Sequence, residues 1–331
     1  MADSNGAPVT VVVSPRESFS YARDSLASIL EQTSRPFTLV YVDAGSPRAV
    51  KQHLEARARE AGFRLVRTEH YLSPNRARNL GLRYVTTKYV AFIDNDVIVT
   101  AGWLAALVQC AEETGATIVS PLICEGQPLH TILHCAGGEC GVREEAQGDG
   151  VRRLLIDKIH DQGRPVVELA GPPRPTGLAE FHCMLVRMEF LQQLGRLDEA
   201  LLNTKEHVDL CMSASAVGGT VYLEPSSIVT WIAGALRWSD MPYYMLRWSD
   251  AWERSSLEHL LAKWKLTEDD YFQRRYRQLG WRRRMAIIDP LSRRLAFGHG
   301  VRTLQKALLA IDRLANPRIT RSYARRHAQS Y

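Results

Sequence analysis

The stretch Tyr89–Val99 reads YVAFIDNDVIV, an apolar run followed by two aspartates that stand one residue apart. The run YVAFI predicts a strand that is buried on both faces and stops at Asp94. At the end of such a strand, Asp94 and Asp96 can point into one crevice and bind a hard cation such as Mg²⁺ or Mn²⁺. Aspartate pairs are also common in ordinary turns, so the meaning of this pair depends on the sequence around it.

The sequence before Tyr89 alternates between short apolar runs and segments with helical spacing. Strands are predicted at residues 9–13, 37–42 and 63–68, and helices at residues 18–31, 47–61 and 75–84. This alternation predicts an α/β fold with a Rossmann-like, doubly wound, mostly parallel sheet. Ligands bind such sheets beyond the carboxyl ends of the strands. The residues at those ends are mostly polar: Pro15, Arg16, Glu17, Asp43, Asp94, Asn95 and Asp96.

The pattern is less regular after the aspartate pair. Residues 122–175 are rich in glycine, proline and charged residues, which favours hairpins and loops that could shape a binding pocket. Further elements are predicted as strands at residues 183–187 and 220–223 and as helices at residues 189–194 and 207–217. Beyond Trp231 the sequence favours helices and is rich in tryptophan, tyrosine and arginine.

Five motifs follow one another along the chain: VTVVVSPR at residues 9–16, VYVDAGS at 40–46, SPNRARNLGL at 73–82, YVAFIDNDVIVTAGWL at 89–104 and GRLDEALLNTKEHVDLCM at 195–212. In this order they resemble the motifs of family 2 glycosyltransferases, which have the GT-A fold. The resemblance implies a GT-A catalytic domain over residues 1–230, with a nucleotide-sugar half over 1–105 and an acceptor half over 106–230. A helical, basic C-terminal extension would cover residues 231–331.

The resemblance also implies roles for residues at the strand ends. The implied donor-binding residues are Pro15, Arg16, Asp43, Arg76, Arg78, Asn79, Asp94 and Asn95. Asp43 would accept a hydrogen bond from a uracil or thymine base. Arg76 and Arg78 would face the diphosphate, because guanidinium groups and helix N-termini suit phosphate; a solvated helix face is the alternative for these arginines. Asp96 would ligate the metal directly, with Asp94 nearer the ribose or holding ordered water.

The segment Glu206-His207-Val208-Asp209 departs from the family pattern, because His207 occupies the position of the general base. A histidine with a pKa of about 6.5 can still accept a proton from a sugar hydroxyl. Glu206 is the alternative base, in which case His207 would bind acceptor or metal. Asp209 is as consistent with a structural role as with a catalytic one.

Two further positions depart from the pattern. Ala44 replaces the second aspartate of the V-V-D-D-G-S motif, and Trp231 stands where many GT-A enzymes have a metal-binding histidine. Trp231 cannot ligate a metal. The third protein ligand would therefore be His182 or His207.

The resemblance implies transfer of a sugar from a UDP- or dTDP-sugar to a hydroxyl of a saccharide acceptor, lipid-linked acceptors included, with Mg²⁺ or Mn²⁺ as cofactor and inversion as the default outcome. The substituted residues keep one alternative open, a catalytically inactive GT-A module that binds a saccharide or a partner. A nucleotidyltransferase is disfavoured, because SPRESFSY (14–21) supplies no glycine-rich phosphate loop.

Charge is unevenly distributed along the chain. The net charge is +6, but residues 271–331 hold fifteen Arg or Lys and two acids, so the rest of the chain is acidic. The segment VRTLQKALLAIDRL (301–314) is amphipathic and could meet an anionic membrane; packing on the acidic body is the alternative. Nucleic-acid binding is not expected. The start, MADSNGAPVT, lacks a secretory pattern, so we expect a cytoplasmic protein or one at the inner face of the membrane.

Overall fold

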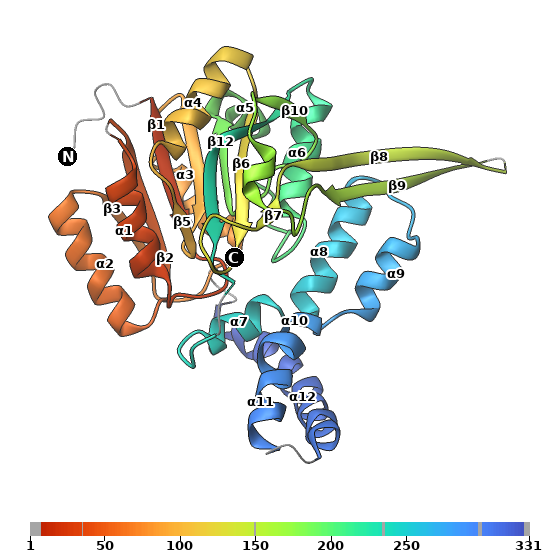
Figure 1. The fold of residues 1–331 in the computed structure, drawn as a ribbon. Coiled ribbons are helices and arrows are strands. Elements are labelled where there is room, and N and C mark those ends of the chain that lie inside the picture. Colours follow the sequence, from red (N-terminus) through yellow and green to blue (C-terminus); the bar gives the residue numbers. More distant parts are fainter. Residues whose placement is uncertain (1–7, 35, 149, 234–235, 297–299, 328–331) are drawn as a thin grey trace.

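A mixed sheet forms the centre of the computed structural model, which describes residues 8–34, 36–148, 150–233, 236–296 and 300–327 (Figure 1). Its strand order is β10-β12-β6-β11-β4-β1-β2-β3, with β5 paired to β12 and β7 paired to β6. The strands are β1 (Val9–Ser14), β2 (Thr38–Ala44), β3 (Arg64–Thr68), β4 (Tyr89–Asp94), β5 (Val97–Val99), β6 (Ile118–Glu125), β7 (Leu133–Cys135), β10 (Arg174–Thr176), β11 (Cys183–Arg187) and β12 (Val221–Trp231).

Most neighbouring long strands run parallel. β3, β2, β1 and β4 are parallel to one another, and β6 is parallel to β12. β11 runs antiparallel between β4 and β6 and so joins the two parallel groups. The predicted α/β class with a mostly parallel, doubly wound sheet is confirmed.

Helices cover both faces of the sheet. They are α1 (Ala22–Gln32), α2 (Arg48–Ala61), α3 (Pro74–Leu82), α4 (Trp103–Thr114), α5 (Met188–Leu194) and α6 (Glu206–Ala216). Side chains on a strand alternate between faces, and β1 shows this directly. Val11 and Val13 enter an apolar cluster with Leu26 and Trp103, whereas Val12 enters a second cluster on the other face.

The chain beyond β12 is helical, as predicted. It forms α7 (Met241–Arg247), α8 (Asp250–Lys263), α9 (Asp270–Arg277), α10 (Trp281–Arg283), a π-helical turn (Arg284–Ile288), α11 (Asp289–Leu295) and α12 (Val301–His327). Leu257, Leu260 and Phe272 of α8 and α9 belong to the same apolar cluster as Val12. The C-terminal helices therefore share a core with the sheet.

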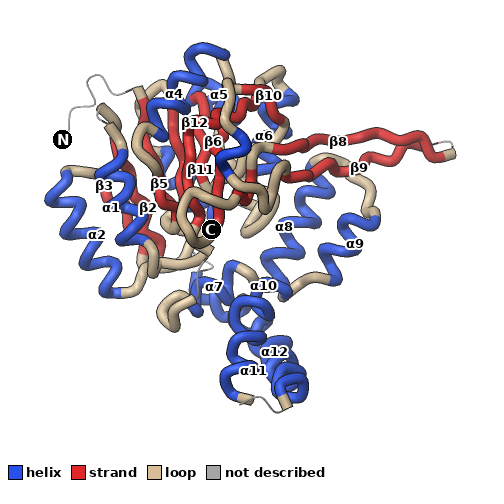
Figure 2. The backbone as a smooth tube through the Cα atoms, viewed as in Figure 1, coloured by secondary structure: helices blue, strands red, loops and turns tan. Residues whose placement is uncertain are grey.

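The irregular region after α4 contains an antiparallel hairpin, β8 (Gly138–Gln147) and β9 (Gly150–Ile159). The hairpin projects far beyond the body of the molecule (Figure 2). A 3₁₀ turn (Val166–Leu169) follows it. The expectation of hairpins and loops over residues 122–175 is confirmed in kind, although β6 itself runs to Glu125.

Two predicted elements differ from the structure by more than two residues at one end. The strand predicted at residues 220–223 continues to Trp231. Its pairing with β6 shifts in register between Glu224 and Ile228 and then resumes, so one strand runs past Pro225. The helix predicted at residues 18–31 begins at Ala22. Residues 18–20 are instead bonded to Asp240, which a local pattern cannot reveal.

Helix α3 lies so close to β1 that Gly81 has no room for a side chain, because an added Cβ would lie 2.5 Å from Cγ1 of Val12. Overpacking of this kind costs about 1–3 kcal/mol, against the gain of about 1 kcal/mol for alanine in a helix. We expect Gly81→Ala to lower the free energy of unfolding by up to about 2 kcal/mol in urea denaturation. Gly150→Ala is the control, because its nearest neighbour would be Gln147 O at 3.7 Å. Unchanged or increased stability of Gly81→Ala would contradict this packing.

Candidate active site

The carboxyl ends of β1 and β4 lie side by side, with Ser14 opposite Asp94 in the parallel register. Asn95 fixes the chain that leaves β1: its backbone N–H donates to Ser14 O at 2.9 Å, and its side-chain amide donates to Ser18 O at 2.9 Å. Its Oδ1 accepts the backbone N–H of Arg16 at 3.0 Å. Asn95 therefore holds the Pro15-Arg16 turn against the aspartate pair.

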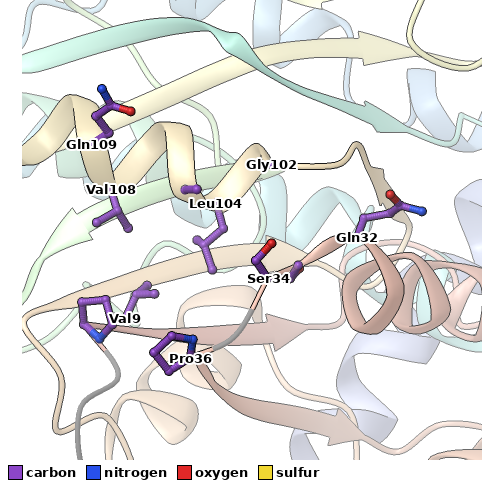
Figure 3. A pocket seen from close by; sticks show the side chains of 11 residues that line it. Val9, Gln32, Ser34, Pro36, Gly102, Leu104, Val108 and Gln109 are labelled. Carbon is purple, nitrogen blue, oxygen red and sulfur yellow. The ribbon is translucent and has the colours of Figure 1, made fainter.

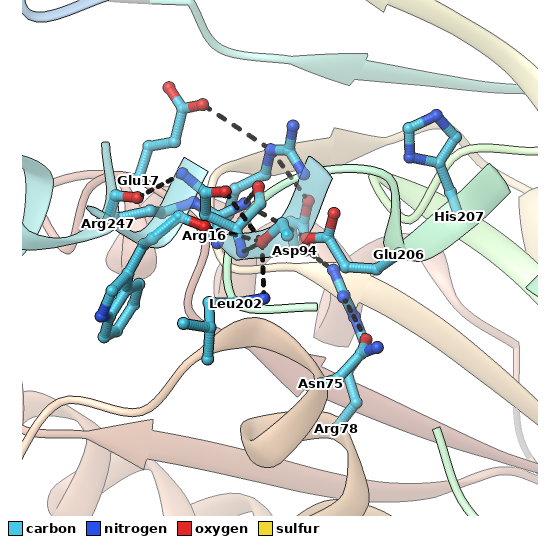
Figure 4. Close-up of polar contacts among 12 residues, drawn as sticks. Arg16, Glu17, Asn75, Arg78, Asp94, Leu202, Glu206, His207 and Arg247 are labelled. Atoms are coloured by element: carbon cyan, nitrogen blue, oxygen red, sulfur yellow. Dashed lines mark hydrogen bonds and ion pairs between the residues drawn. The ribbon is translucent and has the colours of Figure 1, made fainter. Parts of the chain in front are cut away.

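Asp94 lies at the centre of a buried group of charges (Figure 4). Its Oδ1 is 3.2 Å from Nη2 of Arg78, and its Oδ2 is 3.5 Å from Nε of Arg16 and 3.3 Å from Nδ1 of His182. Arg78 is fully buried and lies 3.7 Å over the ring of Phe181. Burial raises the pKa of Asp94, against the opposing charges of Arg16 and Arg78.

Asp96 and His182 form a candidate cation site with Asp94. One ligand atom from each of the three residues lies within 4.8 Å of the others. Among the described residues, Asp94 Oδ2, Asp96 Oδ1 and His182 Nδ1 are buried and have no hydrogen-bond partner. Burial, together with the charges of Asp94 and Glu17, raises the pKa of Asp96 well above its usual value. Burial lowers the pKa of His182, so its ring is neutral. Carboxylate oxygens and a neutral imidazole fit a divalent cation, and buried atoms without partners are what such an ion would satisfy.

Helix α7 of the C-terminal extension covers these residues. Arg247 is fully buried, with Nη2 at 3.6 Å from Oε1 of Glu206 and 3.3 Å from Asn203 O. Tyr243 Oη lies 3.4 Å from Pro15 O and 3.3 Å from Leu72 O, and its single hydrogen is shared between these two acceptors. Because of this cover, the described structure leaves Asp94 and Arg78 without solvent contact.

The base candidates Glu206 and His207 have different surroundings. Although burial opposes its ionisation, Arg247 and Arg78 lower the pKa of Glu206. Burial lowers the pKa of His207, against the charge of Glu180, whose Oε1 lies 3.8 Å from Nε2 of His207. His207 is therefore neutral and stands beside a carboxylate, whereas Glu206 is ion-paired.

Glu180 connects His207 to another histidine. Its Oε2 lies 3.0 Å from Nε2 of His134, whose Nδ1 is 3.1 Å from Oε2 of Glu125. Although burial disfavours a charged ring, the two carboxylates raise the pKa of His134 to about 9. His134 is thus a cation near neutral pH, held between two carboxylates.

Other residues predicted for the site have partners elsewhere. Asp43 is buried and ion-paired with Arg67, and it accepts hydrogen bonds from Ser46 N at 3.1 Å and Ser46 Oγ at 2.9 Å. Asp209 accepts hydrogen bonds from Lys263 Nζ and Trp264 Nε1, both at 2.8 Å. The contacts of Asp209 connect α6 to the end of α8. These contacts and those of Asp43 lie apart from the Asp94 group.

Two residues of α3 contact the segment before α6. Arg76 Nε lies 3.5 Å from Oε2 of Glu199. Asn79 bonds to the backbone of Leu197 in both directions and donates to Oε1 of Glu199 at 2.9 Å. The structure therefore brings Arg16, Arg78, Asp94 and Glu206 together, but directs Asn79 toward residues 197–199.

Hollows open in the surface at both ends of the strands of the sheet. A hollow of about 190 Å³ opens beside Asp96 and is lined by Glu17, Trp231 and Arg282. Trp231 stacks on His182 with ring centroids 4.6 Å apart. A larger hollow of about 330 Å³ lies at the opposite ends of the strands, where β1 begins and α4 passes Pro36 (Figure 3). No charged side chain lines that hollow in the described structure, whereas Asp96 and Glu17 line the smaller one.

Arg247 and Glu180 are site residues that sequence analysis did not identify. Arg247 lies in the Arg-Trp-Ser-Asp segment, whose composition indicates packing as readily as binding. Glu180 precedes β11 without a motif of its own. The signal that could have found it is its position two residues from His182, a candidate metal ligand.

Comparison with known proteins agrees with this geometry. Residues 10–134 match the model of "Glycosyl transferase family 2". A "Pre-mycofactocin glycosyltransferase" of Mycobacterium tuberculosis is 26% identical over 221 residues, 67% of this chain. That alignment spans 42% of the relative's length. The crystal structure of GalNAc-T7 with UDP, GalNAc and Mn²⁺ has a TM-score of 0.52 at 17% identity, covering 84% of this chain and 57% of that chain. The structure of S. aureus TarS 1-349 with UDP-GlcNAc has a TM-score of 0.49 at 13% identity, covering 97% and 92%.

The likeness to GalNAc-T7 confirms the GT-A fold. The family match includes the ends of β1, β2 and β4 and stops before Glu180, His207 and Arg247. Residues 10–134 thus match glycosyltransferase family 2 in sequence, and the chain has the GT-A fold.

Proposed function

We propose that the chain transfers a sugar from a UDP- or dTDP-sugar to a hydroxyl of a saccharide acceptor. One observation carries this proposal: buried polar atoms of both signs converge at the ends of β1 and β4 without hydrogen-bond partners among the described residues. The donors are Arg16 Nε, Arg78 Nε and two nitrogens of Arg247; the acceptors are Asp94 Oδ2, Asp96 Oδ1 and Glu206 Oε1. A diphosphate together with a divalent cation would satisfy both sets.

In this proposal, Arg16, Arg78 and Arg247 bind the donor's diphosphate, because guanidinium groups match phosphate oxygens in charge and shape. Pro15 and Asn95 shape the turn that carries Arg16, Arg76 stands in the first turn of α3, and Asn79 stands further along the same helix. Asp43 would bind the base only if its pair with Arg67 opened or admitted the base alongside. Because α7 covers Asp94, donor binding would also require α7 to shift.

Asp94, Asp96 and His182 would hold the cation, Mg²⁺ or Mn²⁺. When bound, such an ion neutralises charge on the diphosphate leaving group. The chemistry of the donor set supports His182 as the third ligand in place of Trp231, which stacks on it. GalNAc-T7, which shares the fold, was crystallised with UDP and Mn²⁺, in keeping with a divalent cation here.

We favour His207 as the base that takes the proton of the attacking hydroxyl. Its neutral ring has a free electron pair for the proton, and Glu180 can stabilise the resulting imidazolium. Glu206 is less suited, because its ion pair with Arg247 stabilises the deprotonated form. The contacts of Asp209 support a structural role. In-line attack by the hydroxyl would invert the anomeric carbon.

A second candidate function is an inactive GT-A module that binds a saccharide or a partner. The burial of Asp94 and Arg78 beneath α7 favours it, because a permanently closed site could not admit a donor. Donor binding and donor hydrolysis separate the two functions.

Titration of UDP into the protein with Mn²⁺ tests the donor site. We expect binding with Mn²⁺ that is lost in EDTA, and we expect Asp96→Asn to weaken it at least about tenfold, because it removes a proposed metal ligand. Asp24→Asn, an exposed carboxylate on α1, is the matched control and should bind like the wild type. Absence of UDP and dTDP binding under every condition would favour the inactive module.

Hydrolysis of UDP-hexoses tests the base without a known acceptor. His207→Gln should lower the rate about 10²–10⁴-fold, the usual contribution of a general base, while UDP affinity stays unchanged. His160→Gln changes a half-buried histidine that follows β9 and pairs with Glu139, and it should retain the wild-type rate. A variant Glu206→Gln that loses the rate while His207→Gln keeps it would show that Glu206 is the base instead.

A further inference from the structure

The helices at the end of the chain carry exposed charge of one sign. In the described part of residues 284–327, every exposed charged side chain is arginine or lysine. The two acids of this segment are turned inward: Asp312 accepts hydrogen bonds from the buried Arg283, and Asp289 accepts one from Gln305. We call the exposed side chains of residues 284–327 the C-terminal basic surface.

Large apolar side chains are exposed on the same surface. Met285 is 48% exposed, Leu295 53%, Ile311 60% and Leu314 64%. Trp238, which is 81% exposed, lines a hollow of about 510 Å³ with Met285 and Arg294. Exposed apolar groups gathered among basic ones differ from the scattered single residues of an ordinary surface.

Helix α12 is attached to the body through polar contacts along its middle and through aromatic rings near its end, where His327 stacks on His70 and Tyr323 contacts Trp252. Asp312 bonds to Arg283, and Asn316 accepts the backbone N–H of Asp250 at 3.0 Å. Ile311 and Leu314, three residues apart and therefore on one face, are left exposed. An ordinary surface helix buries its apolar stripe and exposes its polar one, so α12 has unsatisfied apolar area on the outside.

We propose that the C-terminal basic surface docks on an anionic phospholipid bilayer. Arginine and lysine are attracted to anionic headgroups, and exposed aromatic and aliphatic side chains insert at the level of the headgroups. The charge of the surface is complementary to such a bilayer. No helix in the described ranges is long and apolar enough to cross a membrane. In Figure 1, α11 and the beginning of α12 lie away from the sheet. The end of α12 returns to the body, where Tyr323 Oη donates to Tyr71 O. This proposal does not depend on the proposed sugar transfer.

Co-sedimentation of the full chain with vesicles tests the proposal. We expect binding to vesicles of phosphatidylcholine with phosphatidylglycerol, little binding to phosphatidylcholine alone, and loss of binding as salt rises. The double variant Arg313→Glu/Arg318→Glu should lower the partition coefficient at least about tenfold. The double variant Ile311→Ser/Leu314→Ser should lower it at least about threefold.

Matched controls change equally exposed residues on the catalytic body. Arg23→Glu/Arg196→Glu reverses the same charge, and Val167→Ser/Val217→Ser removes apolar groups that are 81% and 63% exposed. Both should bind vesicles like the wild type, with thermal unfolding confirming that every variant is folded. Equal loss in the controls, or no preference for anionic vesicles, would overturn the proposal. Two further outcomes would overturn the proposal. One is a protein that binds no vesicles but forms a dimer, which Ile311→Ser/Leu314→Ser dissociates. The other is a protein that duplex DNA displaces from the vesicles.

Discussion

The buried carboxylate of Asp94 is the constraint on which the rest of the site depends. A charge removed from water is strongly unfavourable unless partners surround it, and breaking such a pair leaves the other charge uncompensated. Arg16 comes from the turn after β1, Arg78 from α3 and His182 from the residue before β11. One carboxylate therefore fixes the relative positions of three elements that are far apart in sequence.

The same constraint reaches into the C-terminal helices. Arg247 forms an ion pair with Glu206 of this group. Asp240 accepts hydrogen bonds from residues 18–20, which are close to Arg16 in the sequence. Leu257 and Phe272 add apolar contacts to the core shared with β1. The extension that begins near residue 231 is thus part of the site's structure, although the predicted boundary at residue 230 remains a prediction.

Local patterns predicted the fold, because β1 and β4 are apolar runs and their polar ends stand at fixed places in the sequence. The bonds of Asp240 to the β1–α1 turn and the continuation of β12 past Pro225 were not predictable, since both depend on partners more than a hundred residues away. The same distinction between local and distant determinants applies to the residues of the candidate site. Asp94, Asp96 and Arg78 could be identified from motifs, whereas Arg247 and Glu180 join them only through tertiary packing.

Charge balance gives a reason why donor and cation would bind together. Arg16, Arg78 and Arg247 stand against Asp94, Asp96 and Glu206, so the buried group is close to neutral when its acids are ionised. A diphosphate alone would bring several negative charges into a site of low dielectric, and a cation alone would bring positive charge beside three guanidinium groups. Either step by itself carries a large electrostatic cost. Binding both leaves the group close to neutral, so the affinity for each should depend on the presence of the other.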